Sequence, residues 1–321
     1  MEKVRIALIG AGGMANSVHY PSLAVFDDVE LVGLCDVIED KLNATADRFG
    51  IERRFTDYKR MIEETAPDAV YVLMPPHHLF DVALHVLNAK RHLFIEKPPG
   101  ITAEQTRQMA LAADRAGVMA MVGFNRRYIP LLVECRRRVQ ERGGVFHCVA
   151  TFYKHHFAGP YYGGATDILT CDAVHAVDAL RWMAGGEVFD VASQVRALEG
   201  ETYDNAFNAL VSFDNDCSGV LLANWCVGKR VHTFELHGRG ISAFADCNSV
   251  AHIYADNGEE GATLSATEVA GSDDFRVFYG FEAENRHFVD CVRSGAEPSS
   301  SMADAVKTME LVDLIYGSSI C

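Results

Sequence analysis

Short apolar segments alternate with amphipathic stretches through the first 122 residues. The segments rich in β-branched and aromatic residues are Val4–Ile9, Glu30–Leu34, Ala69–Leu73, His92–Ile95 and Met119–Val122. Between them, apolar residues recur at helical spacing, as in the stretch 38–49, which ends at Gly50. Strands that alternate with helices predict a parallel sheet with helices on both faces. We therefore predict a doubly wound α/β domain over residues 1–122.

The pattern changes after Gly123. Helical stretches are predicted at Pro130–Arg142 and Asp167–Met183, with a strand at Val145–Tyr153 between them. Strand-like runs then follow one another without long helices, at Ala206–Phe213, Gly219–Trp225, Thr233–Leu236 and Ile241–Ala245. Strands without crossover helices pair antiparallel. Residues 123–321 are thus predicted to form an α/β domain with a large open, mostly antiparallel sheet, and its closing helices, Phe281–Arg293 and Met302–Tyr316, could pack back on the first domain.

The composition of the chain disfavours several kinds of binding partner. The 29 Lys and Arg against 44 Asp and Glu give a net charge of −15, which disfavours nucleic acid and anionic membranes. No apolar run approaches the length of a membrane span. The nine cysteines are scattered without a Cys-x-x-Cys pair, which favours reduced thiols over a disulfide framework or a zinc site. We expect a cytoplasmic protein.

A glycine-rich turn follows the first predicted strand directly. The segment Gly10-Ala11-Gly12-Gly13-Met14-Ala15 connects that strand to a helix, as a dinucleotide-binding turn requires. Gly10 would permit the tight turn, and Gly12 would let the backbone approach a pyrophosphate. The helix N-terminus would then offer N–H groups to the phosphates. The first domain is therefore predicted to be an NAD-binding Rossmann domain.

An acidic residue lies where a ribose-binding carboxylate is expected. Asp36 follows the second predicted strand, about 20 residues after the turn. Its carboxylate would accept hydrogen bonds from ribose hydroxyls and repel a 2′-phosphate. Val37 and Ile38 carry no cation to neutralise such a phosphate, although Lys41 could. NAD is thus predicted, and NADP is less favoured.

Several motifs together resemble one known family, the Gfo/Idh/MocA-type oxidoreductases, which include glucose–fructose oxidoreductase and inositol dehydrogenase. The matching segments are GAGGMA at 10–15, GLCDV at 33–37, the stretch from Pro75 to Pro98 with its Glu96-Lys97-Pro98 motif, GFNRRY at 123–128 and the helix from Gly163 to Trp182. The resemblance covers nearly the whole chain. It implies hydride transfer between a nicotinamide cofactor and a sugar, cyclitol or related polyol, and a homodimer or homotetramer that uses the open sheet.

The same resemblance assigns the site residues. It implies that Lys97 and His175 lie at the reacting carbon, and that Gly13, Met14, Pro75, Glu96 and Lys97 join Gly10, Gly12 and Asp36 in binding the cofactor. The chain departs from the family at position 171, where a cysteine occupies the usual place of an aspartate four residues before the histidine. Asp172, three residues before His175, is expected to take that role. Leu79 stands where many members have a histidine, and His77 and His78 lie just before it.

The residues of this helix agree with that assignment. The helix is apolar nearly all round, which is typical of a buried helix, yet it carries Asp172, His175 and Asp178. We interpret Asp178 as part of a core network with backbone or Arg181. The unperturbed imidazole of a histidine has a pKa of about 6.5, which suits His175 for the role of general base near neutrality, and Lys97 would hydrogen-bond the same substrate oxygen. Asp172 would orient His175 or hold a neighbouring hydroxyl.

Further polar side chains are candidates for binding the hydroxyl groups of a polyol substrate. We select Asn125 and Arg127, after the last strand of the first domain, and His156 and Tyr162, before the helix of His175. No acidic or cysteine partner accompanies His155 and His156 at a metal-binding spacing, so no metal is predicted. Two other functions stay open. One is a non-catalytic NAD-binding regulator, and the other is an enzyme that reduces a C=N or conjugated bond, or that modifies a sugar without net redox change.

Overall fold

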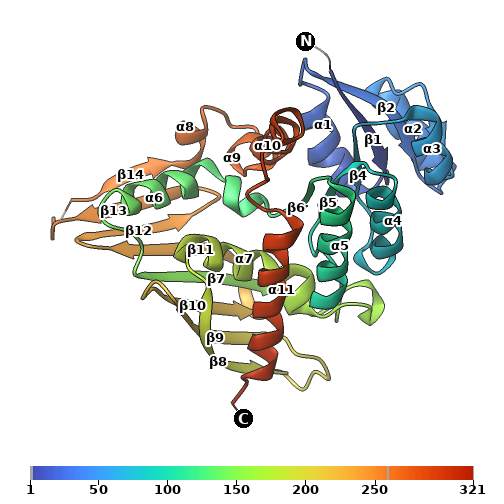
Figure 1. Cartoon of the computed structure of the whole chain (residues 1–321). Coiled ribbons are helices and arrows are strands. Elements are labelled where there is room, and N and C mark those ends of the chain that lie inside the picture. Colours follow the sequence, from blue (N-terminus) through green and yellow to red (C-terminus); the bar gives the residue numbers. More distant parts are fainter. Residues whose placement is uncertain (1–2, 259, 321) are drawn as a thin grey trace. The chain divides into compact units, whose positions relative to one another are not determined.

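The computed structural model describes residues 3–258 and 260–320. The chain divides into two compact units (Figure 1). The first comprises Met1–Gly123 and Phe281–Val306, and the second comprises Phe124–Gly280 and Lys307–Cys321. The first unit is thus assembled from two segments that are far apart in the sequence.

The first unit contains a six-stranded parallel sheet in the order β3-β2-β1-β4-β5-β6. The strands are β1 (Val4–Ile9), β2 (Val29–Cys35), β3 (Arg54–Phe55), β4 (Ala69–Val72), β5 (His92–Glu96) and β6 (Ala120–Gly123). The helices are η1 (Ala15–His19), α1 (Tyr20–Leu23), α2 (Glu39–Phe49), α3 (Tyr58–Thr65), α4 (Pro76–Asn88), α5 (Ala103–Ala116) and α10 (Phe281–Ser294). This strand order is that of a Rossmann fold, so the predicted doubly wound domain is confirmed.

Burial explains the near-continuous apolar sequence of the central strands. Every residue of β4 is buried, as expected for a strand covered on both faces. On one face, α10 packs its Phe288 ring edge-on against Tyr71 of β4 and Phe94 of β5, at centroid distances of 5.5 and 5.6 Å. Tyr71 and Phe94 stack on each other at 4.5 Å. This aromatic group anchors the late segment to the sheet.

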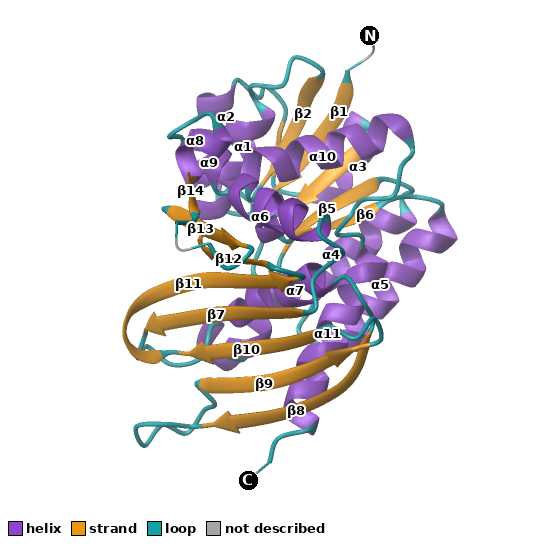
Figure 2. Ribbon diagram, turned by 90° about the vertical axis from the view of Figure 1, so that its left-hand side faces the viewer, coloured by secondary structure: helices purple, strands orange, loops and turns teal. Residues whose placement is uncertain are grey.

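The second unit is built on an eight-stranded sheet in the order β14-β13-β12-β11-β7-β10-β9-β8 (Figure 2). The strands are β7 (His147–His155), β8 (Val188–Arg196), β9 (Ala206–Phe213), β10 (Ser218–Asn224), β11 (Cys226–Gly238), β12 (Ile241–Asp246), β13 (Val250–Ala255) and β14 (Ala262–Ser265). Among the described strands of this second sheet, only β7 and β10 pair in parallel, so the predicted large, mostly antiparallel sheet is confirmed.

Helices cover one face of this sheet. The remaining helical elements are η2 (Asn125–Tyr128), α6 (Pro130–Gln140), η3 (Tyr162–Gly164), η4 (Leu169–Ala173), α7 (Val174–Ala184), α8 (Ala266–Ala270), α9 (Phe275–Phe278) and α11 (Met302–Gly317), whose last part belongs to this unit. Along β7, Cys148, Ala150 and Phe152 are buried, whereas the residues between them are partly exposed. This alternation separates a face packed under α6 and α7 from an open face.

Candidate active site

The glycine turn of the first unit has the backbone geometry that the sequence predicts for a phosphate-binding turn. Gly10 has φ +101°, and a Cβ there would lie 2.2 Å from the carbonyl oxygen of Leu73, so only glycine fits. Gly12 and Gly13 differ, because a Cβ on either would meet no atom within 4 Å. The protein leaves open space beside these two residues, as a bound pyrophosphate would require.

The carboxylate of Asp36 holds this turn in place. Its Oδ2 accepts a hydrogen bond from the backbone N–H of Ala11 at 2.7 Å, and its Oδ1 accepts one from Ile38 at 2.8 Å. Asn16 Nδ2 donates to the carbonyl of Ala11 at 3.0 Å. Asp36 therefore connects the end of β2 to the turn after β1, a structural role that the motif spacing did not reveal.

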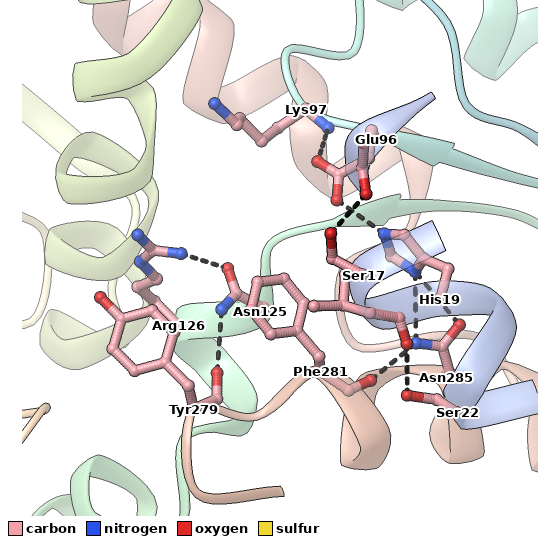
Figure 3. A network of polar contacts seen from close by, with 12 residues as sticks. Ser17, His19, Ser22, Glu96, Lys97, Asn125, Arg126, Tyr279, Phe281 and Asn285 are labelled. Atoms are coloured by element: carbon pink, nitrogen blue, oxygen red, sulfur yellow. Dashed lines mark hydrogen bonds and ion pairs between the residues drawn. The ribbon is translucent and has the colours of Figure 1, made fainter. Parts of the chain in front are cut away.

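A buried histidine follows the turn. His19 is fully buried at the end of η1, a π-helical turn, and its Nε2 lies 2.7 Å from Oε1 of Glu96 (Figure 3). Its Nδ1 lies 3.3 Å from Oδ1 of Asn285 in α10, whose Nδ2 donates to the carbonyl of Phe281 at 2.7 Å. Sequence reasoning missed His19, because its partners are 77 and 266 residues away.

Glu96 in turn contacts the predicted catalytic lysine. Lys97 follows β5, at the same edge of the sheet as the glycine turn and Asp36, and its backbone N–H donates to Oε2 of Glu96 at 3.0 Å. Burial alone would raise the pKa of Glu96, but the hydrogen bond and charge of His19 and the charge of Lys97 outweigh it, and the pKa is lowered. The loop of Lys97 thus begins at an ionised carboxylate. Pro75 and Met14, also predicted at the cofactor site, are exposed.

In the second unit, Asp172 and His175 lie on one buried run that begins with a π-helical turn. The predicted single helix over 167–183 is in fact η4, which contains Asp172, followed by α7, which contains His175. Both residues are buried, at 9% and 6% exposure. π-Turns inside helices are frequent at functional sites because they change the direction of successive side chains.

A polar network surrounds Asp172. Its Oδ2 accepts a hydrogen bond from Tyr161 Oη at 2.7 Å and forms an ion pair with Lys154 of β7. Trp225 Nε1 donates to Tyr161 Oη at 3.1 Å. Burial and the charge of Asp172 raise the pKa of Tyr161, so this phenol stays protonated. Lys154 and Trp225 were not predicted, and their type and strand position alone do not distinguish them from packing residues.

The four residues predicted to bind the substrate, Asn125, Arg127, His156 and Tyr162, lie in different environments. Asn125 is fully buried; its Nδ2 donates to the carbonyl of Tyr279 at 2.9 Å and its Oδ1 accepts from Arg126 (Figure 3). The ring of His156 stacks on Tyr161 at 5.4 Å, and Tyr162 is half exposed with φ +53°. His156 therefore borders the network of Asp172, and Tyr162 follows Tyr161, a member of that network, directly in the sequence.

Arg127 forms a buried ion pair with Asp178 of α7. Its Nε donates to Oδ2 at 2.8 Å and its Nη2 donates to Oδ1 at 2.5 Å. Thr308 donates to the same Oδ1 at 2.9 Å and accepts from Arg181 at 2.7 Å. Asp178 therefore belongs to a core network, which contains Arg127 and Thr308 and which Arg181 joins through Thr308. The ion pair and the hydrogen bond from Thr308 satisfy the buried charges of Arg127 and Asp178 beside α7.

Two kinds of feature are absent from the described residues. Within 3–258 and 260–320, no three His, Cys, Asp or Glu side chains are grouped so that they could hold a metal ion. None of the helices in these ranges combines the length and the apolar character needed to cross a membrane.

Known proteins resemble this chain over nearly its full length. Residues 4–124 match the oxidoreductase family with an NAD-binding Rossmann fold, and residues 141–243 match the GFO/IDH/MocA C-terminal domain. The chain is 34% identical to D-glucoside 3-dehydrogenase of Escherichia coli (strain K12), over 88% of this chain and 87% of that protein. It is 26% identical to myo-inositol 2-dehydrogenase of Thermotoga maritima, over 94% and 92%. The crystal structure of a dehydrogenase from Chromobacterium violaceum has the same fold, with a TM-score of 0.90 at 19% identity, over 99% of this chain and 96% of that chain.

Proposed function

The chain belongs to the Gfo/Idh/MocA oxidoreductase family, and from this premise we propose that it oxidises a secondary alcohol of a sugar, cyclitol or related polyol with NAD. The relatives named above are dehydrogenases of a glucoside and of myo-inositol. One observation carries the proposal furthest. The open glycine turn, Asp36 and Lys97 follow β1, β2 and β5 at the carboxyl edge of one parallel sheet, where such folds bind nucleotides.

The first unit would bind the cofactor. The backbone at Gly12 and Gly13 has room for the pyrophosphate, with Gly10 and Met14 on either side. Asp36 would hydrogen-bond the adenosine ribose and disfavour a 2′-phosphate, while Pro75, Glu96 and Lys97 follow the neighbouring strands. NAD, when bound, accepts the hydride at its nicotinamide ring.

Three residues would act on the substrate. His175 would remove the hydroxyl proton as the general base, and Lys97 would donate a hydrogen bond to the same oxygen as negative charge develops on it. Asp172, held by Lys154 and Tyr161, would orient His175 or a neighbouring hydroxyl. His156 and Tyr162 would contact the rest of the polyol. The buried contacts of Asn125 and Arg127 give both residues structural roles, so we do not propose them as substrate ligands.

The test is the formation of NADH with a panel of sugars and cyclitols. A rise in NADH absorbance that depends on both substrate and enzyme is expected, with NADP a much poorer cofactor. Purified protein should also be analysed for tightly bound NAD. Bound cofactor and sugar conversion without net NADH would instead indicate a redox-neutral enzyme, and NAD binding without any conversion would indicate a regulator.

We further infer a homodimer or homotetramer that forms through the open face of the eight-stranded sheet. Leu210, Phe244 and Tyr254 are 52%, 40% and 40% exposed on strands β9, β12 and β13 of this sheet. Light scattering of the wild type and of Leu210→Glu would test this interface, since the variant should shift the mass towards that of a monomer. A cytoplasmic location fits the eight free cysteines of the described chain.

A further inference from the structure

Arg126 is a buried cation without a carboxylate partner in the described chain. It lies in η2 and is 5% exposed. Its Nη1 donates to Oδ1 of Asn125, its guanidinium lies 4.9 Å from the centroid of the Tyr279 ring, and its Nε has no hydrogen-bond partner among the described residues (Figure 3). The adjacent Arg127, by contrast, is neutralised by Asp178. A buried guanidinium without a counter-ion costs free energy, which an anionic ligand would recover.

A second buried polar group lies in the same region. His232 of β11 is 2% exposed, and its ring stacks on Phe152 at 4.1 Å. Neither ring nitrogen has a hydrogen-bond partner within the described residues. Burial and then the charges of Arg126 and Arg230 lower the pKa of His232, with a further contribution from Lys154 and opposition from Asp172. The imidazole is therefore neutral, and one donor and one acceptor remain for a ligand.

Two aromatic rings connect Arg126 to two further cations. Lys154 Nζ and the Arg230 guanidinium lie 5.1 and 5.8 Å from the centroid of Phe152. Arg230 Nη2 donates to Tyr279 Oη at 3.1 Å, and Arg126 lies over that same tyrosine. We call Arg126, Lys154 and Arg230 the cation cluster.

The charge of the cation cluster is not balanced locally. Among the described residues, the carboxylate of Asp172, which is paired with Lys154, opposes the effect of Arg126, Arg230 and Lys154 on the pKa of His232. This local excess of positive charge stands out in a chain whose net charge is −15. Such a cluster beside Asp172 would attract an anion to the place where we propose that the substrate binds.

We propose that the cation cluster and His232 bind an anionic group, a carboxylate or a phosphate, on the sugar or polyol substrate. The inference rests on the proposed function and narrows its substrate class to sugar acids or sugar phosphates. Arginine suits this task because its planar fork can donate two parallel hydrogen bonds to either anion. His232 would supply a further hydrogen bond.

The experiment compares matched sugars that differ in charge. Hexoses of gluco, galacto and manno configuration are each assayed with their uronate and their 6-phosphate, at saturating NAD, for kcat/KM and for thermal shift. We expect kcat/KM to be at least about tenfold higher for one of the anionic forms than for its neutral hexose, equivalent to about 1.4 kcal/mol. The carboxylate and phosphate arms show which anion is bound.

Two variants and one control locate the effect. Arg126→Gln should abolish the preference for the anion and raise KM for it, and Arg230→Gln should do so in part. Arg230→Gln also serves where circular dichroism shows that Arg126→Gln does not fold. Lys229→Gln removes the same charge from an exposed neighbour of Arg230 and should leave the preference unchanged.

The outcomes separate this inference from the proposed function. Equal kcat/KM for neutral and anionic sugars overturns the inference and leaves the dehydrogenase intact. An increase in KM for NAD in Arg126→Gln, with no change in selectivity, also overturns it. If no sugar yields NADH, the proposed dehydrogenase fails, and the thermal shift then decides the inference. Stabilisation by an anionic sugar that Arg126→Gln loses supports the anion site, and no such stabilisation overturns it.

Discussion

Nε2 of His19 lies 2.7 Å from Oε1 of Glu96, and this buried contact joins the helical segment after the glycine turn to the strand that ends at Lys97. The other carboxylate oxygen of Glu96 accepts the backbone N–H of Lys97. The position of the loop that begins at Lys97 therefore depends on the carboxylate of Glu96. The Glu96 side chain is only 12% exposed, and His19 of η1 stabilises its charge.

Glu96→Gln should lower the free energy of unfolding by about 2 kcal/mol, the usual value for a hydrogen bond to a charged group. The lowered pKa of Glu96 means that this contribution is present above about pH 4.3, the ordinary value, and is lost as the pH falls through the folded-state pKa. Urea unfolding of both proteins at several pH values measures it, and the two stabilities should converge in acid. Glu104→Gln, an exposed carboxylate paired with Arg107, is the control and should change stability little. A constant difference down to low pH would contradict the ion-pair account.

Alanine at Gly10 and at Gly12 should have opposite consequences. Gly10→Ala places a Cβ against the Leu73 carbonyl at a positive φ and should cost several kcal/mol of stability. Gly12→Ala meets no atom of the protein, so stability should change by less than about 0.5 kcal/mol. The affinity for NAD should nevertheless fall by tenfold or more. Thermal unfolding and NAD titration of both variants check this, and unaltered NAD binding in Gly12→Ala would remove the turn from the cofactor site.

Lys97→Met and His175→Asn should each lower kcat by about 10²- to 10⁴-fold, the range for loss of a general acid or base. The Kd for NAD should change little, since neither side chain is proposed to hold the pyrophosphate. Steady-state kinetics and NAD titration separate the two effects. Lys59→Met, at an exposed lysine of the same unit, should behave like the wild type. Equal losses of NAD affinity and turnover would argue against the catalytic assignment.

Asp178→Ala should destabilise the protein by about 3–5 kcal/mol, because it leaves the buried Arg127 without its counter-ion. Asp190→Ala, on the exposed side of β8, should change stability by less than about 0.5 kcal/mol. Chemical denaturation gives both values. Were Arg127 mainly a substrate ligand, Asp178→Ala would instead change KM at nearly constant stability.

His232 should contribute to acid sensitivity. Burial, and then the charges of Arg126 and Arg230, lower the pKa of His232. At mildly acidic pH the imidazole is therefore protonated in the unfolded chain and neutral in the folded chain. His232 should not affect the free energy of unfolding above about pH 6.5. As the pH falls from there towards the folded-state pKa, it should lower the free energy of unfolding by up to about 1.4 kcal/mol per pH unit. His232→Asn should make the acid-side slope of unfolding free energy against pH shallower, whereas the exposed His252→Asn should not. Identical slopes in the wild type and His232→Asn would refute this.

The sequence predicts the elements more readily than the contacts between them. Long periodic stretches such as those of α2, α5 and the central parallel strands carry strong local signals. The strand β3, only Arg54–Phe55, is too short to show any period. The π-turns at Ala15–His19 and Leu169–Ala173 are shifts in backbone hydrogen bonding, which apolar spacing does not encode. The pairings of His19 with Glu96 and of Lys154 with Asp172 depend on tertiary structure and had no local signal.

The packing of α10 on the first sheet has a consequence for biosynthesis. Phe288 and Asn285, which cover Tyr71, Phe94 and His19, leave the ribosome only after the entire second sheet has been translated. The nucleotide domain therefore cannot complete its core cotranslationally as an autonomous N-terminal module. A nascent chain arrested before residue 281 would present an aromatic surface to chaperones, so the maturation of one domain waits for the synthesis of the other.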